Sequence, residues 1–313
     1  MRLKRIEIST TELNRIENEW WNTNSDLIEI IWANSFELQQ AIRLPYLKRM
    51  KSFFLDTAKQ TPVKILEIGC GTGWVGRLVA DESLHIIGTD FSESQINRAK
   101  EEAKRFNKDK FCQYELSDAS TFTKDVDGVL IHAVLHHLST EELNTFFNEF
   151  SKLKKGTKVF FYEPVFFEPN TKTGLLEKAL NRAILFIKKY AFQQIEKTNA
   201  INKQLLSEWN KIYDDATKNG WYISPKEVPF YETEFLDYLH KYGIIKQQFI
   251  VNHTDLDIAQ KLTLHNMHKP GKLYTQFIIP AVIMLEKQLF KRNFRPFIYR
   301  DQHLFVCYEL IIK

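Results

Sequence analysis

The chain of 313 residues has little cysteine, little net charge and no long apolar run. Its three cysteines, Cys70, Cys112 and Cys307, are too few and too widely spaced for a disulfide framework, which predicts a reducing compartment. The longest apolar run, residues 277–285, contains Pro280 and is too short to span a bilayer. The opening residues MRLKRIEIST lack a signal-peptide core, so we expect a cytoplasmic location. A net charge of +4 is not by itself a nucleic-acid signature, and no nucleic-acid partner is expected.

The segment KILEIGCGTGWVG, residues 64–76, is the most informative stretch of the sequence. A strand runs into three glycines at alternate positions, Gly69, Gly71 and Gly73, and then into a segment that favours a helix. Glycines at such a turn let a cofactor lie against backbone N–H groups. Glu67 stands two residues before the first glycine, where a carboxylate would repel a pyrophosphate and favour an ammonium or sulfonium group. The pattern predicts S-adenosyl-L-methionine as the cofactor.

A dinucleotide is the alternative cofactor, because Gly71, Gly73 and Gly76 also match the fingerprint G-x-G-x-x-G. Asp90 follows about 20 residues later, as the ribose-binding acid does in dinucleotide folds. In that register, however, the first strand would have to run through Gly69, an unusual place for a glycine. A plain glycine-rich turn without a ligand is the third interpretation.

A second strand, residues 85–89, ends at another acid, Asp90. Its carboxylate is placed to accept hydrogen bonds from both ribose hydroxyls of an adenosine. Phe91 comes next and can lie against the adenine face. Ser92 is predicted to cap the following helix, with Gln95 in capping-box spacing.

Three further strands are predicted at 111–116, 126–133 and 158–162, with helical segments between them. Asp118 follows the first of these, where it can accept from an adenine amino group or simply hold a turn. The alternation predicts a doubly wound parallel sheet, in which ligands bind outside the carboxyl ends of the strands. The candidates at such ends are Glu67, Asp90, Asp118, His132 and Glu163.

Residues 63–164 resemble the class I S-adenosylmethionine-dependent methyltransferases. The motifs that carry the resemblance are ILEIGCGTG, GTDFS, SDA, VDGVLIHAVLHHL and LKKGTKVFFYEP, in that order. It implies a mostly parallel, seven-stranded Rossmann-like sheet with an antiparallel last strand, for which 243–252 and 303–312 are the sixth and seventh strands. From the strand ends and this resemblance, the candidate cofactor-binding residues are Arg43, Glu67, Gly69, Cys70, Gly71, Gly73, Asp90, Phe91, Gln95, Asp118, Ala119 and His132.

The segments outside this core are predicted to be helical. The N-terminal part is similar to the lid of ubiquinone-pathway O-methyltransferases, in which an arginine matching Arg43 meets the cofactor carboxylate; a solvated arginine is the alternative. Residues 175–197 form a basic amphipathic helix, interpreted as a substrate cap or as an interfacial helix with Lys188 and Lys189 towards lipid headgroups. The expected parts are a lid at 1–60, a cofactor core at 61–164, a cap at 165–242 and the closing strands at 243–313, with an insertion at 253–302.

The chemistry follows from the cofactor, because a sulfonium methyl needs mainly an aligned nucleophile in a dry pocket. A general base is required only if the acceptor must lose a proton, and His132 and His136 are then the catalytic candidates, with packing or orienting roles as the alternative. No metal site is expected, since the pairs His136-His137 and His265/His268 lack companion ligands.

Three functions remain open at this point. The favoured one is methylation of a small, rather hydrophobic acceptor, lipid-like, quinone-like or aromatic, with peripheral membrane contact as an extension. A nucleic-acid methyltransferase is the second, although the fourth strand lacks an Asn/Asp-Pro-Pro-Tyr/Phe segment and the chain lacks a basic stripe with interleaved aromatics. The third is a cofactor-binding protein without transfer activity.

Overall fold

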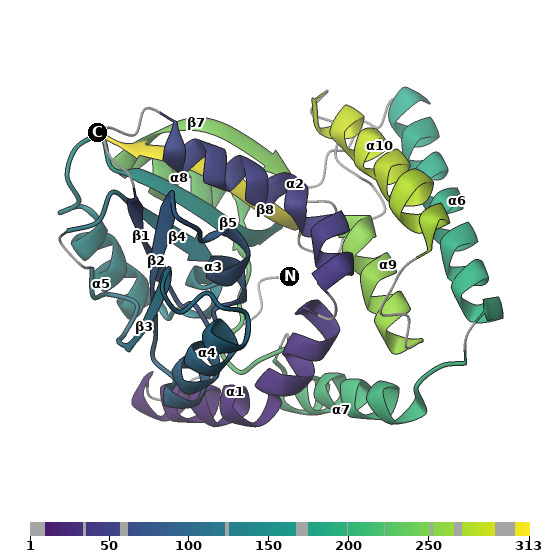
Figure 1. Ribbon diagram of the computed structural model, residues 1–313, viewed down its shortest axis with the longest axis horizontal. Helices are drawn as coiled ribbons and strands as arrows, with labels where there is room; N and C mark the ends of the chain where they lie inside the picture. Colours follow the sequence, from purple (N-terminus) through teal and green to yellow (C-terminus); the bar gives the residue numbers. More distant parts are fainter. Residues whose placement is uncertain are drawn as a thin grey trace.

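The structure, a computed structural model, describes residues 10–33, 36–56, 62–122, 125–166, 175–198, 200–221, 223–250, 253–265, 271–291 and 304–313. Seven strands of its central sheet follow one another in the order β3-β2-β1-β4-β5-β8-β7 (Figure 1). They are β1 Val63–Ile68, β2 Leu84–Asp90, β3 Cys112–Leu116, β4 Gly128–His132, β5 Lys158–Phe166, β7 Gly243–Ile250 and β8 Leu304–Ile312. Strands β1 to β5 are parallel, and β8 is antiparallel to both of its neighbours. The predicted fold class is therefore confirmed.

A short eighth strand, β6 Phe230–Tyr231, pairs with the end of β5 and was not predicted. The boundaries of β4 also differ from the predicted 126–133. Strand β4 begins at Gly128, and the carboxylate of Asp127 just before it accepts a hydrogen bond from the backbone N–H of Lys64 at 2.8 Å. At the other end Ala133 takes a left-handed φ of +58°, which stops the strand at His132.

Helices cover both faces of the sheet, which is why its central strands are apolar on both sides. One face packs against α3 Trp74–Val79, α4 Glu93–Arg105 and the C-terminal half of α2 Phe36–Leu55. The other packs against α5 Thr140–Phe150 and α8 Glu232–Tyr242. On β5, Phe160 and Tyr162 belong to the first layer, and Phe161 and Val165 to the second. This alternation decides which side of the sheet each residue of the site occupies.

Helix α8 packs on the sheet, although its residues fall within the segment predicted to form the cap. The segment 165–242 was expected to lie over the site, but Phe235 and Leu239 of α8 pack on the sheet with Val306 and Tyr308 of β8. A helix of this kind, placed before β7, belongs to the layers of the core. The rest of the segment after β5 forms α6 Leu175–Thr198 and α7 Lys203–Asn219.

The remaining helices gather beyond one end of the sheet. Figure 1 shows α6, α9 and α10 side by side there, with α7 next to α1. Their bounds are α1 Thr10–Ala33, α9 His253–Leu264 and α10 Ile279–Lys291, the last preceded by a π-helical turn, η2, at Leu273–Ile278. Ala191 of α6 and Leu262 of α9 belong to the same apolar cluster as Tyr46 of α2. None of the described helices has the length and apolar composition of a membrane span.

Candidate active site

The three alternate glycines all have left-handed backbone conformations, with φ of +63° at Gly69, +54° at Gly71 and +69° at Gly73. Two of them are also fixed by packing. A Cβ atom at Gly69 would lie 2.5 Å from the side chain of Val134, and one at Gly73 would lie 2.5 Å from the ring of Tyr114. At Gly71 the space is open, because a Cβ there would meet only Oε1 of Gln95, at 3.8 Å. The loop therefore exposes its backbone at Gly71, where a ligand can approach.

Asp90 joins this loop to the end of β2. Its carboxylate accepts hydrogen bonds from the backbone N–H groups of Gly71 and Ser92, both at 2.9 Å. Burial raises the pKa of this carboxyl group, and the N–H donors partly offset that effect. The neighbouring Phe91 is 47% exposed, an unusual state for a phenylalanine at the end of a buried strand. Ribose and adenine contacts for these two residues remain predictions.

Gln95 lies beside the open side of the loop. It is 4% exposed, and its amide Nε2 has no hydrogen-bond partner. A buried unpaired donor costs free energy, so such a group beside a glycine turn fits a site that a ligand completes. Its backbone N–H is bonded by Ser92, which caps α4 as predicted.

Asp118 holds a turn after β3, which is one of the two roles that the sequence allows for it. Its Oδ1 accepts from the backbone and hydroxyl groups of Ser120 and from the hydroxyl of Thr121. The hydrogen bond from the Ser120 side chain is the main reason that the pKa of Asp118 is lowered. Asp118 is exposed and Ala119 packs at the rim of the second apolar layer. The turn lies beside Asp90, because the N–H of Ser117 donates to the carbonyl of Asp90 at 2.9 Å.

Glu67, which the sequence predicts to face the ligand, is buried in the protein. Its side chain is 1% exposed and lies under the first turn of α3, where it accepts a hydrogen bond from the backbone N–H of Gly76 while Oε2 has no partner. Burial raises its pKa to about 8, opposed by the nearby charge of Arg77. A carboxyl group with this pKa is mostly protonated at pH 7. The ligand-free protein therefore has no exposed carboxylate at this position, and a contact between Glu67 and the cofactor stays a prediction.

Cys70 and Arg43 are the other two predicted cofactor contacts. The thiol of Cys70 is buried and its pKa is raised by burial, while its backbone N–H donates to the carbonyl of Thr89 at 2.8 Å. Cys70 thus helps to hold the loop against β2. Arg43 belongs to α2, but its side chain lies outside the described part of the structure.

His132 stands at the end of β4 inside an aromatic enclosure. Its ring stacks on Tyr162 of β5 with centroids 4.0 Å apart and planes at 4°. Trp74, the residue after the glycine loop, meets it edge-on at 5.2 Å. The hydroxyl of Tyr46 from α2 lies 3.3 Å from Nε2 of His132. These rings bring a titratable imidazole next to the cofactor loop and surround it with apolar surface.

The sequence did not single out Tyr162 or Trp74 for this site. Strand register accounts for one of them, because His132, the last residue of β4, pairs with Tyr162 of β5. Strand β5 continues to Phe166 and does not end at residue 162 as predicted. Tyr46, which follows Arg43 by three residues, was not among the predicted site residues. Its position over His132 depends on how α2 packs across the sheet, which no local pattern reports.

His136, the second catalytic candidate, lies on the opposite side of the sheet from His132. It is 3% exposed, and its Nδ1 is 2.7 Å from Oε2 of Glu163. Oε1 of Glu163 accepts the backbone N–H groups of Val134 and Leu135, both at 2.9 Å. Burial lowers the pKa of His136 and raises that of Glu163 to about 7. Glu163 and His136 hold the loop after β4, and the structure does not bring the two histidines together.

Helix α1 bridges the segments that follow β2 and β4. Asn22 accepts from the hydroxyl of Ser92 at 2.9 Å. One turn earlier, the buried Glu17 lies 3.0 Å from Nδ1 of His137 and accepts from the hydroxyl of Ser224 at 2.9 Å. Burial opposes protonation of His137, but the adjacent Glu17 outweighs it and raises the pKa of the imidazole. Helix α1 is thus tied to the segments after β2 and after β4, and its role as a lid stays a prediction.

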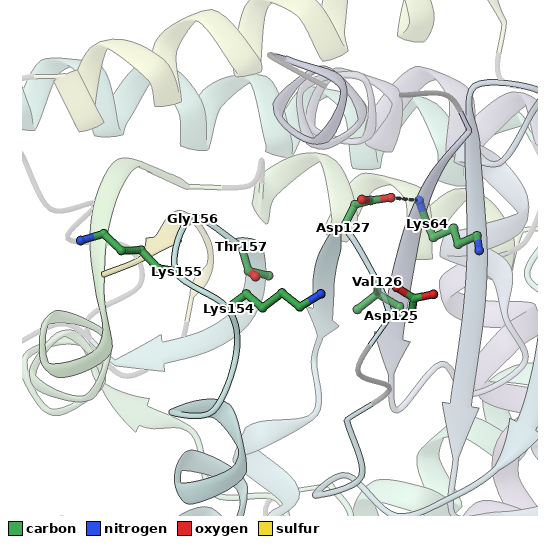
Figure 2. A pocket seen from close by; sticks show the side chains of 8 residues that line it. All are labelled: Lys64, Asp125, Val126, Asp127, Lys154, Lys155, Gly156 and Thr157. Atoms are coloured by element: carbon green, nitrogen blue, oxygen red, sulfur yellow. Dashed lines mark hydrogen bonds between the residues drawn. The ribbon is translucent and has the colours of Figure 1, made fainter. Parts of the chain in front are cut away.

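A separate cavity of about 370 Å³ lies at the amino-terminal edge of the sheet. Figure 2 shows it with Lys154 and Asp125 on its walls and the Asp127 carboxylate bonded to Lys64. Its full lining is Lys64, Asp125, Val126, Asp127, Lys154, Lys155, Gly156 and Thr157. None of these is a candidate site residue, and doubly wound sheets bind ligands at the other edge. Within the described residues no group of three or more histidines, cysteines or carboxylates could hold a metal, and His268 lies outside them.

Part of the chain is similar to known methyltransferases. Residues 65–156 match the sequence model of a methyltransferase domain. A ubiquinone biosynthesis O-methyltransferase of Pelagibacter ubique is 27% identical over 156 residues, which cover 48% of this chain and 61% of the relative. The chain thus spans less than two thirds of that relative.

Two solved structures share the fold over nearly the whole chain. Phosphoethanolamine N-methyltransferase 2 of Haemonchus contortus, in complex with S-adenosyl-L-methionine, has a TM-score of 0.55 at 15% identity and covers 98% of this chain and 60% of its own. A (4+2)-cyclase has a TM-score of 0.54 at 14% identity, with 94% and 95% covered. The glycine loop and the strand-end acid both lie within the matched methyltransferase domain. These findings support the resemblance to class I S-adenosylmethionine-dependent methyltransferases and S-adenosyl-L-methionine as the cofactor.

Proposed function

We propose that the protein transfers the methyl group of S-adenosyl-L-methionine to a small, mainly apolar acceptor that lies against His132. The observation that carries this proposal is the enclosure of His132 by Tyr46, Trp74 and Tyr162 next to the glycine loop. Aromatic walls with one convergent polar pair are typical of small-molecule sites. They do not suit a charged polymer.

The polar pair suits an acceptor that must lose a proton. His132 can take a proton from a phenol, alcohol or ammonium group, and the Tyr46 hydroxyl, 3.3 Å from Nε2, can hold the ring in one orientation. When bound, the cofactor supplies an electrophilic methyl group. The chain then has to orient the acceptor and exclude water, so His132 and Tyr46 are proposed as its acid–base and orienting residues.

The helices beyond the sheet support an apolar acceptor. Ile195 of α6, Ile258 of α9 and Ile279 of α10 belong to the apolar cluster that contains Tyr46 and Tyr162. A cover of this composition keeps water from the reacting atoms and favours lipid-like, quinone-like or aromatic molecules. A relative named for ubiquinone biosynthesis is consistent with that class.

Binding without transfer is the second candidate function, because one solved structure with this fold is a (4+2)-cyclase. Both functions predict tight binding of S-adenosylhomocysteine. They differ in whether label from the cofactor reaches an acceptor.

The experiment incubates the purified chain with methyl-labelled cofactor and three acceptors: a prenylated catechol, a short catechol and bulk tRNA. We expect label in the catechols, with the prenylated one preferred, and none in tRNA. His132→Ala and Tyr46→Phe should lower turnover, whereas both variants should still bind S-adenosylhomocysteine. The controls His85→Ala, at the start of β2, and Tyr213→Phe, on α7, should change neither. Labelled tRNA would contradict the proposal, and tight cofactor binding with no labelled acceptor from a whole-cell metabolite extract would favour the second candidate.

A further inference from the structure

Exposed apolar side chains gather on two neighbouring helices of the protein. Among the described residues, thirteen large hydrophobic side chains are exposed; five lie on α6 and three on η2 and α10, which makes eight. The eight are Leu175, Leu176, Leu185, Phe186, Tyr190, Leu273, Phe277 and Met284. Helices α6 and α10 pack against each other, and Figure 1 shows them side by side at the edge of the molecule. An apolar area of this kind marks an interaction site.

The outward side of η2 and α10 is apolar along its length. Leu273, Phe277, Pro280 and Met284 are exposed and recur at helical spacing, with Phe277 at 65% and Met284 at 59%. The inward side is apolar as well, since Ile278 and Val282 are buried. A helix that packs on one side and still presents such a stripe to the outside is built to contact an apolar medium.

The outward side of α6 combines an aromatic ring with positive charge. Phe186 is 72% exposed, and Arg182 and Lys189, four residues before and three after it, are exposed on the same side. The acidic residues on these helices do not offset this charge. Glu177 of α6 and Glu286 of α10 are buried, and Glu196 is paired with Lys261 at 2.7 Å.

Of the two lysines predicted to face lipid headgroups, Lys188 and Lys189, only one is exposed. Lys188 is half-buried, with its ammonium group 5.6 Å from the centre of the Phe192 ring. Among the two lysines named from the sequence, Lys189 is the exposed one. Arg182 takes the place that Lys188 was expected to have.

We propose that this surface, made by Arg182, Phe186 and Lys189 of α6 with Leu273, Phe277 and Met284 of η2 and α10, docks on an anionic lipid surface. Apolar side chains at such a face enter the boundary between headgroups and acyl chains, while basic residues beside them contact anionic headgroups. Two copies of the chain could not pair through this surface without bringing like charges together, which disfavours a homodimer as its partner.

The docking surface lies on the same helices that cover the proposed site. Its helices carry the inner apolar residues that join the cluster around Tyr46, so lipid contact would place the covering helices of the proposed site at the bilayer. An apolar acceptor dissolved in the membrane could then enter without crossing water. This use rests on the proposed function, whereas the docking itself does not.

The test is co-sedimentation of the full chain with vesicles of phosphatidylcholine alone and of phosphatidylcholine with phosphatidylserine. We expect binding to the anionic vesicles that weakens as salt is raised. Arg182→Glu with Lys189→Glu should weaken it by about tenfold or more, and Phe186→Ser with Phe277→Ser by a similar factor. The matched controls, Lys100→Glu with Lys104→Glu on α4 and Ile244→Ser on β7, should bind as the unchanged protein does.

Circular dichroism and S-adenosylhomocysteine binding of each variant show that it is folded. These readouts also separate the two proposals, since failure to sediment with intact cofactor binding refutes docking alone. Equal binding of the charge-reversed and control variants would overturn the proposal. So would light scattering that shows a dimer which the Phe186→Ser and Phe277→Ser changes dissociate, because the surface would then be a protein interface.

Discussion

Glu163 should control cofactor binding without touching the cofactor, through the loop that follows β4. That loop begins with Ala133 at a φ of +58°, a conformation that costs an alanine about 1–2 kcal/mol. Glu163 is fully buried and opposes this strain with hydrogen bonds to the N–H groups of Val134 and Leu135 and to His136. The loop matters to the cofactor because the side chain of Val134 packs directly on Gly69.

The perturbation is Glu163→Ala, which removes three hydrogen bonds of about 1 kcal/mol each. Without them, the free-energy difference between the original and the relaxed loop conformations moves by about 3 kcal/mol in favour of the relaxed ones. Only the fraction that keeps the original shape binds cofactor, so affinity for S-adenosylhomocysteine should fall by up to about 100-fold. Glu163→Gln keeps one oxygen that can accept the two N–H groups. Its affinity for S-adenosylhomocysteine should therefore lie between those of the unchanged protein and Glu163→Ala.

Ala133→Gly provides the internal check, because glycine has no penalty at this φ. On its own it should change affinity by less than about twofold, since Glu163 already holds the loop. Added to Glu163→Ala, it should restore about fivefold by removing about 1 kcal/mol of strain. The assay is titration calorimetry with S-adenosylhomocysteine, and urea unfolding confirms that each variant folds. Unchanged affinity in Glu163→Ala, or no recovery in the double variant, would refute the reasoning.

Three further results are expected. Asp90→Ala should weaken S-adenosylhomocysteine binding by roughly 1–3 kcal/mol by calorimetry, because ribose hydroxyls lose a charged partner, whereas tight binding of NAD by the unchanged protein would contradict the cofactor assignment. Glu67 has a pKa of about 8 in the folded protein against an ordinary 4.5, so the folded state holds its proton more tightly and the free energy of unfolding should fall as pH rises from 4.5 to 8, by at most about 5 kcal/mol. Glu67→Gln should remove most of this fall in urea titrations, and an unchanged pH dependence would show that the carboxyl group is solvated. His132→Ala should lower turnover on a phenolic acceptor by about 100-fold or more with little change in cofactor affinity, and full activity would mean that no histidine base is used.

The sheet could be predicted from the sequence because each strand carries its own signal. Strands such as β4 are apolar runs between turn residues, and Asp90 marks the end of β2 with a change of polarity. Glu163 was predicted to follow the end of the fifth strand but lies within β5, which continues to Phe166. The glycine positions were equally informative, since only glycine adopts a left-handed turn three times in five residues at low cost. In this part of the chain, the local sequence preferences for strands and turns agree with the fold.

The contents of the site were harder to predict, since they depend on contacts between distant segments. Glu67 looked accessible because it precedes a ligand loop, but the first turn of α3 folds back over it and removes it from water. Nothing in the sequence near Glu17 indicates that it meets His137 and Ser224, which come from segments more than one hundred residues away. Tertiary packing decides such contacts, and it also decides whether a strand-end carboxylate serves a ligand or a neighbouring loop.

Strand β5 shows how packing divides these tasks between consecutive residues. Tyr162 and Glu163 are neighbours in the chain and point to opposite faces of the sheet. On one face Tyr162 stacks on His132, where a rigid ring fixes the imidazole for chemistry. On the other face Glu163 holds the loop that starts at Ala133. A change at Tyr162 should therefore act on the His132 ring itself, whereas a change at Glu163 should act on the loop that begins one residue after His132.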